Sequence, residues 1–270
     1  MFTFKLNDGN ELPAIGSGTN TFGKENSSYM GEINFDTTPI ETAIEVGYRR
    51  FDTAISYRNE AVLALGIKNS NIARNELFIT SKLPNTEEFA SNREAVVKGI
   101  ELSLKNLDTD YIDLYLIHHP SDDNATNLMI WEVFEEYHHN GVLKSIGVSN
   151  FNQKQLQYLM DHSKTVPAVN QIESNPNSLN DELIDFCQQH GIVPEAWGPF
   201  HGVTEQQQET LATIGKAHGK TWAQVFLRYQ LDRGVAVIPK SHNQRRQASN
   251  LDVFDFTLSD EEKNTIKGLA

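Results

Sequence analysis

Short apolar runs alternate with amphipathic stretches along almost the whole chain, and eight such runs can be distinguished. Strands that alternate with helices usually pair in parallel and are joined by right-handed crossovers. Within 270 residues, eight strand–helix units fit a closed barrel better than an open doubly wound sheet. We therefore predict an α/β chain folded as a (β/α)8 TIM barrel, with strands at residues 14–18, 48–51, 77–81, 112–117, 144–148, 167–170, 192–196 and 235–239.

Local turn and capping signals support this arrangement. The turn Asp8-Gly9-Asn10 between two β-rich runs predicts an N-terminal β-hairpin, which we expect to close the bottom of the barrel. A Ser or Thr followed three residues later by Glu or Gln is typical of a helix N-terminus, and Asn is a favoured capping residue. Such signals predict helix caps at Thr38, Ser91, Asn180, Thr221 and Ser259.

Composition narrows the class of protein. No Pro/Gly-rich linker divides the chain, so residues 1–270 are predicted to form a single domain. The 23 Lys and Arg against 36 Asp and Glu give a net charge of −13, which argues against general binding to nucleic acid or anionic membranes. The N-terminal residues lack the basic start and apolar core of a signal peptide. We expect a cytoplasmic protein without nucleic-acid or membrane partners, a monomer or at most a weak dimer.

Metal and disulfide sites are not predicted. The single cysteine, Cys187, rules out an internal disulfide and a Cys-based zinc site, and it is expected in the core. The pair His118-His119 follows a predicted strand, where adjacent side chains point to opposite faces. No carboxylate–histidine spacing typical of zinc enzymes accompanies it.

The chemistry is expected where the predicted strands end. In (β/α)8 barrels the functional residues gather at the C-terminal ends of the strands. Here each strand is followed by polar, ionisable or aromatic side chains rather than by core-filling ones. In chain order these are Asp52 with Tyr57, Lys82, His118, Ser149 with Asn150, Gln171, Trp197, and Lys240 with Ser241.

These residue types suit the reduction of a carbonyl group. A tyrosine with its ordinary pKa near 10 is a weak acid, and a neighbouring lysine ammonium is expected to lower that pKa. A carboxylate beside the lysine would hold it charged and in place. His118 could donate a hydrogen bond to a carbonyl oxygen as Tyr57 protonates it. Because side chains do not transfer hydride, a nicotinamide cofactor is implied.

Six segments in this order and spacing carry a resemblance to a known family: FDTAISYRNE, TSKLPN, DLYLIHHP, SIGVSNF, VNQIE and IPKSHNQRRQASN. Together they resemble the aldo-keto reductases, in particular the short bacterial members like 2,5-diketo-D-gluconate reductase. The resemblance implies the barrel fold, NADPH as cofactor and a catalytic tetrad at Asp52, Tyr57, Lys82 and His118.

The resemblance also implies cofactor contacts. It assigns the nicotinamide carboxamide to Ser149, Asn150 and Gln171, and ring stacking to Trp197 in place of the usual tyrosine. The same match gives the adenosine 2′-phosphate to Lys240, Ser241 and Arg246, and the neighbourhood of the adenine to Asn250. A Lys and an Arg close together can hold a phosphate, and a solvated basic face is the alternative interpretation.

Departures from the family pattern concern the substrate pocket. Asn20 and His119 stand where relatives often carry tryptophan, so both are predicted to bind substrate in a more polar pocket. Replacement walls are expected from Phe22, Tyr29 and Met30 in the long loop over residues 20–36. This pocket favours small polar aldehydes, dicarbonyls or keto-sugar acids as the carbonyl substrate.

Two other functions are compatible with such a barrel. A Schiff-base aldolase would use Lys82 as a nucleophile, but its pairing with Asp52 should keep it protonated. A non-catalytic sensor or subunit that binds NADPH would keep the fold and the cofactor site without turnover.

Overall fold

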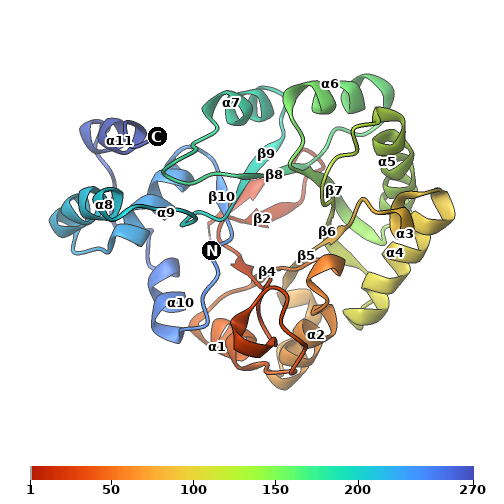
Figure 1. The fold of residues 1–270 in the computed structure, drawn as a ribbon, viewed down its shortest axis with the longest axis horizontal. Coiled ribbons are helices and arrows are strands. Elements are labelled where there is room, and N and C mark those ends of the chain that lie inside the picture. Colours follow the sequence, from red (N-terminus) through yellow and green to blue (C-terminus); the bar gives the residue numbers. More distant parts are fainter. Residues whose placement is uncertain (1) are drawn as a thin grey trace.

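The computed structural model describes residues 2–270, and parallel strands form the centre of the molecule (Figure 1). They are hydrogen-bonded in the order β10-β9-β8-β7-β6-β5-β4-β3. A parallel bridge between Ile15 and Val237, with the Gly16 amide donating to the Val237 carbonyl at 2.8 Å, joins the first strand region to the last. The predicted (β/α)8 barrel is confirmed. Its strands are β3 (Ser17–Gly18), β4 (Arg50–Asp52), β5 (Phe78–Leu83), β6 (Ile112–Ile117), β7 (Leu143–Ser149), β8 (Val169–Glu173), β9 (Val193–Trp197) and β10 (Ala236–Val237).

Helices surround this sheet on its outer side, as Figure 1 shows. Their inward faces supply apolar side chains, such as Trp131 and Phe134, that are fully buried against the strands. Cys187 is buried in the same core, as predicted. The helices are α1 (Thr38–Val46), α2 (Glu60–Asn69), α3 (Glu87–Ala90), α4 (Arg93–Asn106), α5 (Asn124–His139), α6 (Gln153–His162), α7 (Asp181–Gln189), α8 (Glu205–His218), α9 (Trp222–Asp232), α10 (Gln244–Leu251) and α11 (Asp260–Lys267).

Two of the predicted capping boxes are confirmed. Thr221 caps α9 by accepting from the Gln224 amide, and Ser259 caps α11 by accepting from the Glu262 amide. Asn180 does occupy the cap position of α7, but its side chain donates to the Glu173 carbonyl at 2.5 Å instead of capping the helix.

The other two predicted caps are wrong by one residue. Helix α1 is preceded by Thr37, and Thr38 is already helical. Helix α4 is capped by Asn92 rather than Ser91, with Asn92 Oδ1 accepting from the Ala95 amide at 2.9 Å. Asn is at least as good a cap as Ser, so the adjacent residue prevails over the apparent Ser-x-x-Glu box.

The N-terminal hairpin closes one end of the barrel. Strands β1 (Thr3–Lys5) and β2 (Glu11–Pro13) pair antiparallel across the predicted turn. The side chain of Asn10 donates to the Lys144 carbonyl at 2.9 Å, and that of Asn7 to the Pro167 carbonyl at 3.0 Å. Both carbonyls lie where β7 and β8 begin or shortly before, so the hairpin covers the N-terminal ends of the strands, as predicted.

The barrel interior changes character along its axis. Near the hairpin it is apolar, with Leu12, Leu114 and Leu116 fully buried in one cluster. Elsewhere on the strands, the buried side chains include charged and polar ones. Such side chains are unusual in a protein interior because burying a charge costs free energy unless the charge is paired. These side chains are Arg50, Asp52, Lys82, Gln171 and Glu195.

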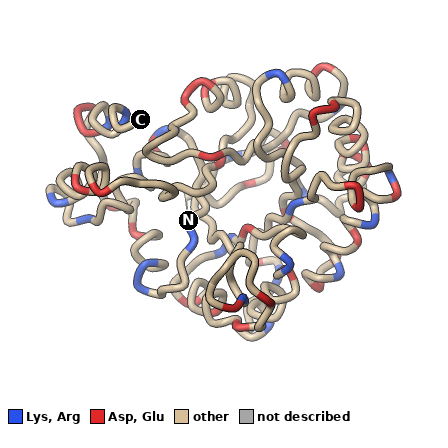
Figure 2. The backbone as a smooth tube through the Cα atoms, in the orientation of Figure 1, with Lys and Arg blue, Asp and Glu red and all other residues tan. Residues whose placement is uncertain are grey.

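Acidic and basic residues are distributed over the helices and loops around the barrel (Figure 2). Acidic residues outnumber basic ones, in keeping with the net charge of −13. Among residues 2–270, no helix combines the length and the apolar character needed to cross a membrane.

Candidate active site

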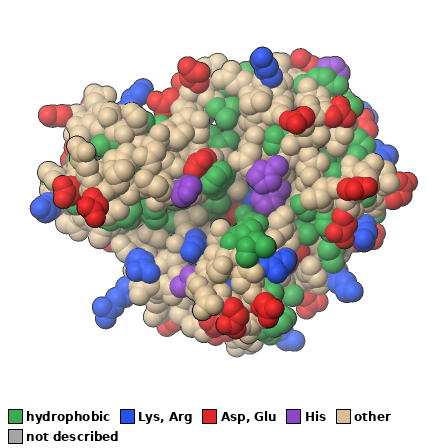
Figure 3. All heavy atoms as spheres, in the orientation of Figure 1, with side chains coloured by type: hydrophobic (Ala, Val, Ile, Leu, Met, Phe, Trp, Pro, Cys, Tyr) green, Lys and Arg blue, Asp and Glu red, His purple; other side chains and the backbone are tan. Residues whose placement is uncertain are grey.

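A cavity of about 580 Å³ opens at the C-terminal ends of the strands. Figure 3 shows the hollow near the centre of this face, with histidine and hydrophobic side chains at its rim. Of the predicted site residues, Lys82, Ser241, Arg246 and Asn250 do not line it. Those that do are Asn20, Asp52, Tyr57, His118, His119, Ser149, Asn150, Gln171, Trp197 and Lys240.

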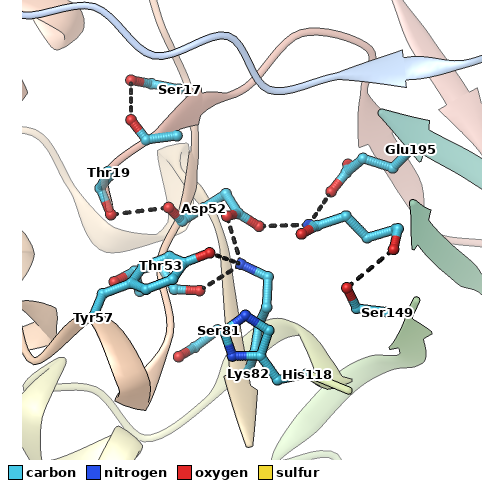
Figure 4. A network of polar contacts seen from close by, with 12 residues as sticks. Ser17, Thr19, Asp52, Thr53, Tyr57, Ser81, Lys82, His118, Ser149 and Glu195 are labelled. Atoms are coloured by element: carbon cyan, nitrogen blue, oxygen red, sulfur yellow. Dashed lines mark hydrogen bonds and ion pairs between the residues drawn. The ribbon is translucent and has the colours of Figure 1, made fainter. Parts of the chain in front are cut away.

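Asp52, Lys82 and Tyr57 come together at the floor of the cavity (Figure 4). Asp52 ends β4, Lys82 lies near the end of β5, and Tyr57 ends a short 3₁₀ turn (Ile55–Tyr57) that follows β4. The Lys82 Nζ donates to Asp52 Oδ1 at 2.6 Å, to the Thr53 carbonyl at 2.9 Å and to the Tyr57 hydroxyl at 3.3 Å. An ammonium has three protons, and each of them has an acceptor here.

Burial dominates the proton equilibria of this cluster. It lowers the pKa of Lys82 below its ordinary value, while the charge of Asp52 and its hydrogen bond act in the opposite direction. Burial, followed by the charge of Asp52, raises the pKa of Tyr57 well above 10. In the free protein the pKa of Tyr57 is thus raised, not lowered as expected from the neighbouring Lys82, chiefly because the phenol is buried. Tyr57 is fully protonated at neutral pH.

His118 is held as a neutral imidazole beside Tyr57. It follows β6 directly, its amide donates to the Leu83 carbonyl at 2.9 Å, and its ring meets that of Tyr57 edge-on at 5.5 Å. Burial first, and then the charges of Lys82 and His119, lower the pKa of His118 from 6.5 to about 2. Its Nδ1 is buried and has no hydrogen-bond partner within residues 2–270. A neutral ring has one N–H to donate.

The depressed pKa of His118 should make the fold sensitive to acid. Below pH 6.5 the unfolded chain takes up a proton on this histidine and the folded chain does not, so stability falls as the pH falls. His118→Asn should remove this effect, so that between pH 7.5 and 5 the wild type loses about 2 kcal/mol more than the variant. Urea unfolding at both pH values measures it. His139→Asn, which changes an exposed histidine, should follow the wild type. An equal loss of unfolding free energy in His118→Asn and in the wild type would show that His118 is not the source of the acid sensitivity.

Asn150 links two walls of the cavity. It follows β7 in a left-handed conformation, with φ of 63°, which asparagine tolerates better than most residues. Its side-chain amide donates to the His118 carbonyl at 3.1 Å, and its Oδ1 accepts from the Trp197 indole at 2.9 Å. The neighbouring Ser149 hydroxyl donates to the Gln171 carbonyl at 3.0 Å.

Gln171 projects from β8 between two carboxylates. Its Nε2 donates to Asp52 Oδ2 at 2.8 Å and to Glu195 Oε1 at 2.6 Å. Both amide hydrogens are thereby used, and no group in residues 2–270 donates to its Oε1. An acceptor of this kind, lining the cavity, fits the amide N–H of a nicotinamide carboxamide.

A basic corner lies where β10 leads into α10. Neither Lys240 nor Arg246 forms a salt bridge in the part of the chain that the structure describes, although the protein is acidic overall. Burial and the charge of Arg246 lower the pKa of Lys240. The Arg246 Nε donates to the Ser241 hydroxyl at 3.3 Å. Two cations held together without a counter-ion fit a phosphate group. Asn250 is buried on the same helix.

The long loop over residues 20–36 contributes one wall. Tyr29 lines the cavity, and its ring lies 5.9 Å from that of Tyr57. The other two residues expected there do not line the cavity: Phe22 is fully buried against His242, and Met30 is 76% exposed. Asn20 has a buried Oδ1 for which residues 2–270 provide no partner, and it faces the cavity as predicted.

Several residues at or below the cavity were missed by sequence reasoning. Phe200 and His201 line it from the loop after β9, whose sequence gives no signal of its own. Arg50 and Glu195 lie in the barrel interior beneath it. Both interrupt apolar runs that were predicted to be strands, and a charge inside such a run was the available signal. Within residues 2–270, no group of three His, Cys, Asp or Glu side chains is placed to hold a metal ion.

Comparison with known proteins gives consistent matches over almost the whole chain. A family model described as aldo/keto reductase family matches residues 14–270. Glyoxal reductase of Bacillus subtilis is 40% identical over 99% of this chain and 92% of its own. Methylglyoxal reductase DkgA of Escherichia coli O157:H7 is 39% identical over 98% and 92%. The crystal structure of a Bombyx mori aldo-keto reductase in complex with NADP superposes with a TM-score of 0.88, at 38% identity over 99% and 92%.

Proposed function

The chain belongs to the aldo/keto reductase family, among relatives of the short bacterial type, and on this premise we propose that it reduces small aldehydes and dicarbonyls with NADPH, using Tyr57 as the proton donor. The observation that carries the proposal is the contact of the Tyr57 hydroxyl with the ammonium of Lys82, at 3.3 Å on the floor of the cavity. An NADP-bound relative with the same fold supports the choice of cofactor.

The residues present fit this cofactor at both of its ends. Lys240, Ser241 and Arg246 would hold the 2′-phosphate, with Asn250 near the adenine. Gln171 would accept a hydrogen bond from the carboxamide with its Oε1, Ser149 and Asn150 would lie beside it, and Trp197 would stack on the ring. When bound, the reduced nicotinamide supplies the hydride.

The proton comes from the chain itself. As negative charge develops on the carbonyl oxygen, Tyr57 donates its proton to that oxygen and becomes a phenolate. Lys82 stabilises this phenolate through its hydrogen bond, and Asp52 holds Lys82 in position. His118, being neutral, would donate its N–H to the same oxygen and orient the substrate. The three acceptors around Lys82 Nζ favour its protonated form, which has no lone pair with which to attack a carbonyl carbon. This arrangement disfavours the aldolase alternative.

The walls of the cavity favour a small, polar substrate. Asn20 and His119 offer hydrogen-bonding groups in the same cavity as Tyr57. The relatives named for glyoxal and methylglyoxal reduction point to dicarbonyls as substrates. Loss of nicotinamide absorbance should be measured with NADPH and a panel of short aldehydes, dicarbonyls and keto acids. Turnover with any of them supports the proposal. Binding of NADPH without turnover on the whole panel would favour a non-catalytic sensor instead.

The basic corner should govern the choice between NADPH and NADH. Lys240→Ala or Arg246→Ala is expected to weaken NADPH binding roughly tenfold to a hundredfold, because each removes a charged partner of the 2′-phosphate. NADH, which lacks that phosphate, should bind almost as before. Fluorescence titration gives both dissociation constants, with Lys68→Ala on α2 as a control for the change in net charge. Equal losses for the two nucleotides would place the 2′-phosphate elsewhere.

A further inference from the structure

An ion pair crosses the barrel interior beneath the proposed site. Arg50 in β4 and Glu195 in β9 form a salt bridge, and both side chains are fully buried. The two strands are not neighbours in the sheet, so the pair spans the barrel from one wall to another. Arg50 Nη1 also donates to the Pro13 carbonyl at 3.0 Å, which ties it to the hairpin end of the barrel.

Gln171 connects this pair to the catalytic cluster. One N–H of its amide donates to Glu195 and the other donates to Oδ2 of Asp52. The other oxygen of Asp52, Oδ1, accepts from the Lys82 ammonium at 2.6 Å. The result is a continuous chain of polar contacts from Arg50 to the Tyr57 hydroxyl. Figure 4 shows its part from Glu195 to Tyr57. Its two carboxylates are balanced by one ammonium and one guanidinium.

Stability alone does not account for the Arg50–Glu195 pair. A buried salt bridge loses so much hydration that replacing both partners by apolar residues is often neutral or stabilising. The pair does, however, place a second carboxylate, that of Glu195, against the side-chain amide of Gln171. The oxygen and the NH₂ group of this amide are similar in size and differ in whether they accept or donate a hydrogen bond. Without Glu195, one N–H of this amide would be unpaired and its orientation would rest on the single hydrogen bond to Asp52.

We propose that Glu195, held by Arg50, is a positioning residue that locks the Gln171 amide with its oxygen toward the cavity, where it meets the nicotinamide carboxamide. The inference rests on the proposed function, since it names a residue that shapes the cofactor site of that reductase. Glu195 does not line the cavity, so it would act on the cofactor site through Gln171. A turned amide would oppose the carboxamide N–H with its own N–H groups and leave both sides without an acceptor.

A matched pair of variants tests this role. Arg50→Met/Glu195→Met removes both charges and the acceptor, whereas Arg50→Met/Glu195→Gln removes both charges and keeps an acceptor oxygen at position 195. We expect the Met/Met protein to bind NADPH about tenfold more weakly than wild type, and the Met/Gln protein to recover most of that loss. Binding of 2′-phospho-ADP-ribose, which has no nicotinamide, should be the same in all three proteins.

The outcomes separate positioning from general structure. Equal losses for NADPH and 2′-phospho-ADP-ribose, or equal behaviour of the two variants, would overturn the role of Glu195. Wild-type protein that does not bind NADPH would instead refute the proposed function. If the variants do not fold, NMR of the wild type decides, with the Gln171 amide assigned by its loss in Gln171→Met. Two downfield N–H signals, both protected from exchange with water, support the lock, and an N–H at an ordinary shift that exchanges rapidly with water overturns it.

Discussion

Tyr57→Phe should abolish most of the carbonyl reduction, lowering kcat/KM by about 10²–10⁴-fold, the usual contribution of a positioned general acid. The phenyl ring can keep its edge-on contact with His118, at 5.5 Å in the wild type, so the shape of the cavity floor should be preserved. What disappears is the hydroxyl that contacts Lys82 and carries the proton. Steady-state turnover with the best substrate of the panel measures the loss.

The affinity for NADPH separates the proton donor from a binding residue. It should change little in Tyr57→Phe, because none of the proposed cofactor contacts involves this hydroxyl. Tyr158→Phe, which removes a phenolic oxygen from the outer helix α6, should retain wild-type turnover. A variant at position 57 that still turns over would show that another group donates the proton, and one that loses NADPH would assign Tyr57 to cofactor binding.

Lys82→Met should lower turnover by a similar 10²–10⁴-fold and also destabilise the fold by about 3–5 kcal/mol. Turnover falls because the developing phenolate of Tyr57 loses its charged partner. The fold suffers because Asp52, almost fully buried, loses the cation that neutralises it. Urea unfolding and turnover are measured on the same samples.

A second substitution separates the two effects of Lys82. In Lys82→Met/Asp52→Asn no uncompensated charge is left in the barrel, so most of the lost stability should return while turnover stays low. The Asn side chain keeps an oxygen that can still accept from Gln171. Recovery of turnover in this double variant would show that Lys82 acts by supporting the structure and not by assisting Tyr57.

The strands and the residues that follow them were predictable from the sequence. Runs such as 112–117 are apolar at all positions but one, because barrel strands are covered on both sides, and the polar residue that follows each run marks the open end of the barrel. Asp52, Lys82 and His118 were identified in this way. Their proximity follows from the parallel register, in which Asp52 pairs with Thr80 and Lys82 with Leu116.

What could not be predicted depends on residues distant in the sequence or on details of burial. The pairing of Arg50 with Glu195 requires knowing which side chains face each other across a closed barrel, and no local pattern contains that information. The pKa of Tyr57 depends mainly on how deeply its phenol is buried, which only the folded structure shows. Phe200 and His201 reach the cavity through a loop whose path is set by tertiary contacts.

The salt bridge inside the barrel also limits how the sequence can change over time. A single substitution at position 50 or 195 leaves an unpaired charge in a place that water does not reach, and such a change is expected to cost several kcal/mol. Related chains should therefore lose or keep these two charges together. Because both residues reach Asp52 through Gln171, lineages without the pair should also hold the Gln171 amide by some other acceptor. Positions 50, 171 and 195 are thus expected to evolve as one unit, although they lie on three different strands.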